Sequence, residues 1–216
     1  PSLYFFDMYH TLIDNDCDVS WKDFLIARGL APPEARVTAQ RFFEQYKRGA
    51  LQIEEFLAFQ LQEFRGRSPA EMAQLAEEHF NDVVTHTIYG DARRKVQEAL
   101  GHGAPVVLLS ATNEVIARPV ARELGIPDIL ATRLQIRDGT YTGALEGPYC
   151  GGEGKVTVAQ GYCDEHGYSL AAAAYYGDST ADIPMLDAVG FPRPTNPSDQ
   201  LIQYAVSRGW PLVNFA

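Results

Sequence analysis

The sequence predicts an α/β fold in which a doubly wound, mainly parallel sheet carries an inserted all-α domain. From about residue 88 onward, short apolar runs typical of buried strands alternate with patterns typical of helices. Residues 19–85 show helical periodicity and no strand-like alternation. Parallel strands need crossover connections, so helices are expected on both faces of the sheet.

The first strand is expected at residues 3–6, a short apolar run that ends in Asp7. The helical segment 19–85 follows, with Pro32-Pro33 and the stretch 66–69 as breaks between helices. Its apolar faces are formed by Trp21, Phe24 and Leu25, by Phe42, Phe43 and Tyr46, and by Phe56, Leu57, Phe59 and Leu61. Several short helices are therefore expected here.

The rest of the chain alternates between the two patterns. We expect helices at 91–100, 113–124, 155–166 and 182–188, strands at 105–109, 128–131, 171–176 and 211–215, and a hairpin at 134–143 with Asp138-Gly139 at its turn. Residues 1–14 and 88–216 would then form the α/β core domain, and residues 15–87 the inserted helical domain.

Composition restricts the class of protein. Apolar residues make up 46% of the 216 residues, enough for a substantial core. The formal charge of −10 disfavours nucleic acid as a partner. No apolar run approaches the roughly 20 residues that span a bilayer, and the start has no basic region typical of a signal peptide. The three cysteines lack CxxC spacing, so we expect a reduced, cytoplasmic protein. We also expect a monomer or homodimer that has no membrane partner.

Polar residues follow three of the expected strands. Asp7, Ser110 and Asp178 each come at the end of an apolar run. Ligands of such sheets bind beyond the carboxyl ends of the strands, so these three side chains are expected to meet. Two carboxylates and a hydroxyl indicate a hard cation held by oxygen atoms.

Four motifs extend this pattern, and with them the chain resembles the haloacid dehalogenase superfamily of phosphohydrolases. They are Phe6-Asp7-Met8-Tyr9-His10-Thr11-Leu12, Leu109-Ser110-Ala111-Thr112, Gly152-Glu153-Gly154-Lys155 and Gly177-Asp178-Ser179-Thr180-Ala181-Asp182. Their order and spacing are similar to the phosphoserine-phosphatase-like branch, which has a Rossmann-like core and a helical cap. The resemblance covers nearly the whole chain and assigns 15–87 to the cap.

The resemblance implies a magnesium-dependent phosphate-monoester hydrolase that acts on a small phosphorylated metabolite. Asp7 would attack phosphorus and form an aspartyl-phosphate. Mg²⁺ would be held by Asp7, the main-chain carbonyl of Tyr9 and Asp178, and would remove the repulsion between nucleophile and phosphate.

The other motif residues would support this reaction. Lys155 would neutralise charge on the phosphoryl group, and Ser110, Ala111 and nearby backbone N–H groups would bind its oxygens. Asp182 would hold a metal-bound water or Lys155, and Thr11 would order the turn after the nucleophile. Taken singly, Ser110 also fits a helix cap, Lys155 a surface lysine and Asp182 an acid at a helix start.

The chain departs from the family at one catalytic position. The family usually has an aspartate two residues after the nucleophile, which protonates the leaving oxygen and then activates water. Tyr9 stands there. A phenol, with a pKa near 10, donates a proton readily enough but is a poor base. Three explanations are open. The enzyme would be slow or use His10 as the base, or the chain would be a phosphotransferase or a protein that binds a phosphorylated metabolite. In the third, the leaving group needs little proton assistance. His10 also fits a packing role in the turn.

The cap residues nearest the first motif are candidates for substrate contacts. Asp16 or Asp18 would pair with a substrate ammonium or imidazolium, or else cap the first helix of the insert. Arg48, or Arg41, is a further candidate, whereas Trp21 fits the core better. Similar bacterial proteins hydrolyse histidinol phosphate or phosphoserine, and the overall pattern resembles the former group more.

Overall fold

A computed structural model describes all residues, 1–216. Five parallel strands form one sheet in the order β3-β2-β1-β6-β7. Their bounds are β1 Leu3–Phe6, β2 Val106–Asn113, β3 Asp128–Thr132, β6 Ala173–Gly177 and β7 Phe191–Pro194. The chain runs outward from β1 to β2 and β3, then crosses to β6 and β7. The carboxyl ends of β1 and β6 therefore meet at the switch point of the sheet, where such folds bind ligands.

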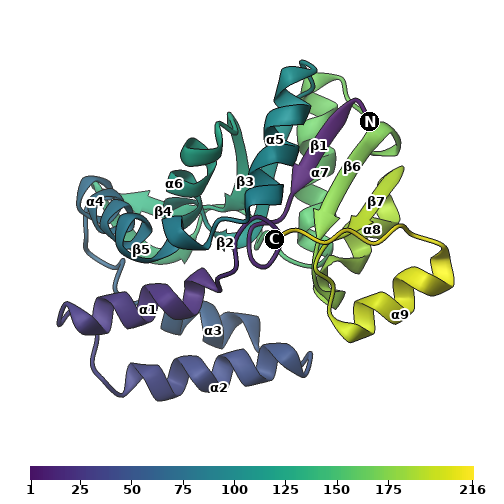
Figure 1. The fold of residues 1–216 in the computed structure, drawn as a ribbon. Coiled ribbons are helices and arrows are strands. Elements are labelled where there is room, and N and C mark those ends of the chain that lie inside the picture. The colour runs from purple at the N-terminus through teal and green to yellow at the C-terminus, as the bar shows by residue number, and fades with distance from the viewer.

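Helices cover both faces of the sheet, as the doubly wound prediction requires (Figure 1). They are α5 Gly90–Gly101 and α6 Glu114–Leu124 on one face, and α7 Glu153–His166, α8 Ile183–Ala188 and α9 Asp199–Arg208 on the other. Alternate residues of β1 point to opposite faces: Phe6 belongs to the cluster under α5 and α6, and Phe5 to the one under α7 and α8.

The segment between β1 and α5 is helical. It contains α1 Cys17–Ala27, α2 Ala35–Lys47, α3 Ile53–Gln60 and α4 Pro69–His79, followed by the short turns η1 Phe80–Val84 and η2 Thr85–Thr87. Figure 1 shows α1, α2 and α3 together beyond the carboxyl ends of the strands, whereas α4 lies beside α6. The inserted helices therefore face the same edge of the sheet as Asp7 and Asp178.

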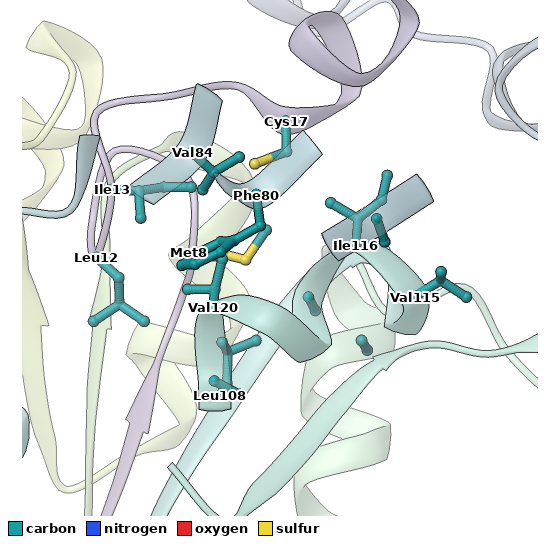
Figure 2. Close-up of a cluster of buried hydrophobic side chains, with 14 of the residues drawn as sticks. Met8, Leu12, Ile13, Cys17, Phe80, Val84, Leu108, Val115, Ile116 and Val120 are labelled. Carbon is teal, nitrogen blue, oxygen red and sulfur yellow. The ribbon is translucent and has the colours of Figure 1, made fainter. Parts of the chain in front are cut away.

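One apolar cluster joins the sheet to the inserted helices. Met8, two residues after β1, packs with Cys17 of α1, Phe80 and Val84 of η1, and residues of β2 and α6 (Figure 2). Trp21 is fully buried in the same cluster, stacked on Phe24, which agrees with its expected core role. The turn that carries Tyr9 thus follows a residue fixed in the core.

The remaining elements agree with the sequence except near the C-terminus, where neither helix α9 nor the edge strand β7 was expected. The hairpin consists of β4 Leu134–Arg137 and β5 Thr140–Leu145, and a short turn, η3 Leu170–Ala172, precedes β6. The strand expected at 211–215 is wrong: only Val213 bridges to Thr195 there, and the edge strand is β7. Pro192 and Pro194 disfavour a strand, but an edge strand needs hydrogen bonds on one side only.

Two further properties bear on the cellular setting. Cys17, Cys150 and Cys163 are free thiols, and all three are buried. None of the helices has the length and apolar character needed to cross a bilayer.

Candidate active site

The three polar residues expected at the strand ends line a single cavity. Asp7 follows β1, Ser110 lies in β2, and Asp178 follows β6. The cavity has a volume of about 690 Å³ and extends from this edge of the sheet to α2 and α3. Strand β2 continues three residues past Ser110, with a shift in register against β3 between Leu109 and Asn113. Ser110 therefore lies at an irregular point of the strand rather than at its end.

A buried lysine stands at the centre of the carboxylate group. Lys155, in the first turn of α7, places its Nζ 3.0 Å from Asp7 Oδ1, 2.8 Å from Asp182 Oδ1 and 2.9 Å from the Tyr175 hydroxyl. Tyr175 also donates to Asp182. The three donors of the ammonium group are thus matched by three oxygen atoms. Asp182 holds Lys155, which is one of the two roles that the resemblance implied.

Asp182 is fully engaged by these contacts. Its Oδ2 accepts the backbone N–H groups of Asp178 and Ser179 at 3.0 and 3.1 Å. Burial acts to raise its pKa, but Lys155, Tyr175 and these N–H groups together hold the pKa below its ordinary value. Asp182 is therefore an anion that orients the lysine and the loop after β6.

The two carboxyls at the strand ends have the opposite tendency. Burial raises the pKa of Asp7 to about 6, against the lowering effect of Lys155. Burial and the charges of Asp7 and Asp182 raise the pKa of Asp178 well above its ordinary range. The three carboxyls of Asp7, Asp178 and Asp182 share the one lysine, Lys155, which leaves an excess of negative charge.

This excess fits a hard divalent cation. Carboxylate oxygens of Asp7, Asp178 and Asp182 lie within 4.8 Å of one another. Because Asp182 is committed to Lys155 and to backbone N–H groups, Asp7 and Asp178 are the carboxylates that remain to bind an ion. Mg²⁺ prefers a donor set of few carboxylates, completed by water and substrate oxygen, and the cavity has room for both.

Backbone and small side chains surround the space beside Asp7. Ser110 is buried, and its hydroxyl accepts the Thr112 N–H at 3.3 Å, so Ser110 does not cap α6; Asn113 does. Ala111 also lines the cavity, as do Gly151 and Gly152 before α7. A Cβ on Gly151 would meet the Tyr149 ring, so a larger residue at this approach to the helix start would displace that ring.

The turn after Asp7 places three predicted residues differently. Tyr9 lines the cavity, and its buried hydroxyl has no hydrogen-bond partner of good geometry. His10 also lines the cavity, with a left-handed φ of 54° and a carbonyl that accepts from Asn196. Thr11 is fully buried, and its hydroxyl is likewise unpartnered.

Tyr9 faces the acids of the insert. Burial raises its pKa well above 10, and the next cause is the charge of Asp18, followed by Cys17 and Asp16. The phenol therefore stays protonated at neutral pH and is a weaker base than an ordinary tyrosine.

The two acids at the start of α1 have separate roles. Asp16 caps the helix by accepting the N–H groups of Asp18 and Val19 at 3.0 and 3.3 Å, and it also lines the cavity. Asp18 is no cap: its carboxylate accepts the Thr112 hydroxyl at 3.2 Å and opens to the cavity. Burial, and then the charge of Asp16, raise the pKa of Asp18 to about 7.

The predicted arginine is elsewhere. Arg48 is exposed and does not line the cavity, and neither does Arg41. Arg48 lies just after the end of α2, and the residues of the last turn of this helix that line the cavity are Tyr46 and Lys47.

Three residues that hydrogen-bond to residues of the site were missed by sequence reasoning. Tyr175 was read as a core residue of a strand, because a tyrosine in an apolar run carries no sign of a polar partner. Tyr46 of α2 bonds to Ser179 of the loop after β6 at 3.1 Å, a contact across 133 residues. Thr112 is the last residue of the second motif, two positions after Ser110, but the motif alone did not indicate its contact with Asp18.

Comparisons with known proteins agree on one family. The family model described as haloacid dehalogenase-like hydrolase matches residues 4–187. A protein of Neisseria meningitidis named histidinol-phosphatase is 34% identical over 219 residues, which is 99% of each chain.

Solved structures give the same match. A protein with unknown function from Bordetella pertussis is 36% identical and superposes with a TM-score of 0.91, over 98% of this chain and 97% of that one. A phospho-aspartyl intermediate analogue of phosphoserine phosphatase superposes with a TM-score of 0.70 at 20% identity, over 99% of this chain and 92% of that one, and so shares the fold.

Proposed function

We propose that this chain, which belongs to the haloacid dehalogenase-like hydrolase family and is a phosphatase, hydrolyses a small phosphate monoester with Asp7 as nucleophile and Mg²⁺ as cofactor. The observation that carries the proposal is the position of Lys155 between Asp7 and Asp182, at the switch point of the sheet. A histidinol-phosphate-like or phosphoserine-like ester is the substrate class that the named relatives suggest.

Asp7 performs the bond-forming step. One carboxylate oxygen attacks phosphorus, the ester oxygen leaves with the electron pair of the P–O bond, and an aspartyl-phosphate forms on Asp7. Lys155 keeps Asp7 ionised and offsets charge on the phosphoryl oxygens. Ser110 and the backbone N–H groups near Ala111 and before α7 hold those oxygens.

The metal site consists of the Asp7 carboxylate, the Tyr9 carbonyl and Asp178. When bound there, Mg²⁺ offsets the repulsion between the nucleophile and the phosphate dianion. Asp182 takes no metal in this proposal, because its oxygens already hold Lys155 and two backbone N–H groups.

Tyr9 makes release of the aspartyl-phosphate the slow step. The phenol can protonate the leaving oxygen, but its raised pKa disqualifies it as the base that activates water. His10 is the other ionisable group of this turn that lines the cavity and has room to act. The same observation favours a second candidate, a protein that binds a phosphorylated metabolite or passes the phosphoryl group to an acceptor.

The inserted helices are proposed to select the substrate as a cap domain over residues 15–87. Helices α2 and α3 supply the wall opposite Asp7, and the Tyr46–Ser179 hydrogen bond holds that wall to the loop after β6. Three free thiols suit a reducing compartment, so we place the enzyme in the cytoplasm.

Hydrolysis of p-nitrophenyl phosphate by the purified chain tests the proposal. We expect turnover that needs Mg²⁺, is lost on chelation and is absent in Asp7→Asn, while Asp164→Asn, an isosteric change at an exposed acid of α7, keeps it. Turnover that survives in Asp7→Asn would refute the nucleophile. Stoichiometric phosphorylation without release of phosphate would instead support a phosphotransferase. Phosphate binding without phosphorylation would support a protein that binds a phosphorylated metabolite.

A further inference from the structure

The cavity wall away from Lys155 has an unusual balance of charge. At the reaction end, Lys155 is shared by Asp7 and Asp182 and leaves no cation to spare. Beyond it, the carboxylates of Asp16 and Asp18 line the wall, and no arginine does. The part of the cavity that receives the leaving group is therefore acidic.

The one other cation on the wall is poorly placed to offset these acids. Lys47, at the end of α2, pairs with Glu44 at 2.9 Å and lies 4.9 Å from the centre of the Phe43 ring. Its side chain is 50% exposed. A lysine so partnered and solvated gives little attraction to an anion inside the cavity.

Another part of the cavity wall is aromatic. Phe42, Phe43, Tyr46, Phe56 and Phe59 of α2 and α3 all line the cavity. Phe42 is the centre of this group, with ring centroids 5.3 Å from Phe59 and 5.6 Å from Phe56. Aromatic faces attract organic cations and stack on planar rings, but offer nothing to a carboxylate.

A polar atom without a partner lies on the acidic side. The Tyr9 hydroxyl is buried and lies within reach of the Asp18 carboxylate and Thr112, but makes no hydrogen bond of good geometry to either. Buried polar atoms are rarely left unpaired, which marks this spot as a place for a hydrogen-bonding ligand group. The phenol oxygen and the Asp18 carboxylate together offer acceptors to an ammonium N–H.

We propose that the leaving group of the substrate is a cationic amino alcohol without a carboxylate, its ammonium held by Asp18 and a planar ring, such as imidazole, by the aromatic wall. The inference rests on the proposed phosphatase function and narrows it. A substrate carboxylate next to the ammonium would meet two acids and no free cation, so phosphoserine is the ester that the cavity rejects.

Asp18 is the anchor rather than Asp16. Asp16 already accepts two backbone N–H groups as the cap of α1, whereas Asp18 accepts the Thr112 hydroxyl at 3.2 Å and has the Tyr9 hydroxyl nearby, with no backbone N–H on its carboxylate. Lys22, in the next turn of α1, is sealed off by Glu63, with Nζ 2.7 and 2.8 Å from its two oxygens. Asp18 therefore keeps acceptor capacity for a ligand.

Two matched esters isolate the carboxylate. O-phosphoethanolamine and O-phosphoserine differ by that group alone. We expect kcat/KM for phosphoethanolamine to exceed that for phosphoserine by at least about tenfold, because like charges in an interface are strongly disfavoured. Histidinol phosphate, which adds an imidazole to the amino alcohol, should exceed both. Equal values for the matched pair, or a preference for phosphoserine, would overturn the proposal.

Variants test the anchor. Asp18→Asn should reduce the preference for phosphoethanolamine over phosphoserine by about tenfold or more, since it removes one of the two opposing charges. Asp23→Asn, an exposed acid of the same helix that pairs with Arg36 outside the cavity, is the matched control and should leave the ratio unchanged. Thermal unfolding of both variants checks that the fold is intact. An unchanged ratio in folded Asp18→Asn would refute the anchor.

Failure of the catalytic proposal can be recognised separately. Titration calorimetry with Asp7→Asn and the same three esters gives the order of affinity without turnover. The expected order in binding, together with no hydrolysis of any ester by the parent chain, would retain the specificity and reject the phosphatase. Mg²⁺-dependent hydrolysis with no discrimination between the matched esters would retain the phosphatase and reject the proposed specificity.

Discussion

Stability should depend on pH through one buried histidine that links α4 to α1. His79 is 1% exposed, and its Nε2 lies 2.9 Å from the Ser20 hydroxyl. Ser20 donates its only proton to Asn15, so it accepts from His79 and the imidazole is the neutral Nε2–H tautomer. Burial lowers the pKa of His79 from 6.5 to about 4, against the raising effect of Asp82.

The sign and size of the effect follow from linkage. The unfolded chain binds the proton near pH 6.5 and the folded chain only near pH 4. The stabilisation from the neutral ring is therefore complete above pH 6.5 and is lost as the pH falls through this window. At roughly 1.4 kcal/mol per pKa unit, the loss is about 2.5 kcal/mol at about pH 4.5 and approaches about 3.5 kcal/mol at lower pH.

Urea denaturation of the parent chain and His79→Gln isolates this contribution. The parent chain's free energy of unfolding relative to the variant should fall by about 2.5 kcal/mol between about pH 7.5 and 4.5. Taking the difference matters, because Asp7 and Asp18 have raised pKa values and change stability in the opposite direction.

A control separates the titrating ring from its hydrogen bond. Ser20→Ala removes the partner and keeps the imidazole, so it should lower stability by about 1 kcal/mol while the chain retains its dependence on pH. A difference between parent and His79→Gln that stays within about 0.5 kcal/mol across the window would refute the reasoning.

Three further changes address the active site. Tyr9→Asp supplies the missing base and should raise phosphatase turnover by about tenfold or more; equal or lower turnover with Mg²⁺ binding intact would contradict this. Lys155→Met leaves two buried carboxylates unpaired, so we expect a loss of about 3–5 kcal/mol in urea denaturation at neutral pH, and turnover of p-nitrophenyl phosphate at least about 100-fold lower; full activity would remove Lys155 from the mechanism. Tyr46→Phe breaks the bond to Ser179 and should raise KM about threefold with little change in the melting temperature; an unchanged KM would show that this bond does not hold the closed cavity.

Much of the fold could be predicted because local pattern and tertiary role agree. The apolar run 3–6 is buried on both faces of a parallel sheet, so its composition alone identifies it. Composition did not identify the edge strand β7. Its prolines disfavour a strand, because each removes a backbone N–H donor. The loss of these hydrogen bonds costs little free energy at the edge of a sheet, and the position of β7 at the edge is known only from the assembled sheet. The apolar segment 211–215 has the composition of a strand, but it forms only a single bridge, between Val213 and Thr195.

The site was predictable where one residue acts at the end of a strand, and less so where two distant elements meet. Asp7 and Asp178 could be placed together because the ends of parallel strands share an edge. The capping role of Asp16 was an open alternative, and only its two short N–H contacts decide it. Tyr175 and Tyr46 depend on partners far along the chain, which periodicity does not report.

The tyrosine at position 9 and the acids of α1 form one arrangement. An aspartate at position 9 would add a carboxylate beside Asp18, whose pKa is already raised to about 7 by burial and by Asp16. A phenol can lie next to these acids without adding charge, because its pKa stays far above neutrality. The acidic wall that would hold a cationic leaving group is therefore easier to maintain with Tyr9 than with the usual base. On this account the chain gives up speed in releasing the phosphoryl group and retains a subsite for an ammonium, and the two departures have a common electrostatic cause.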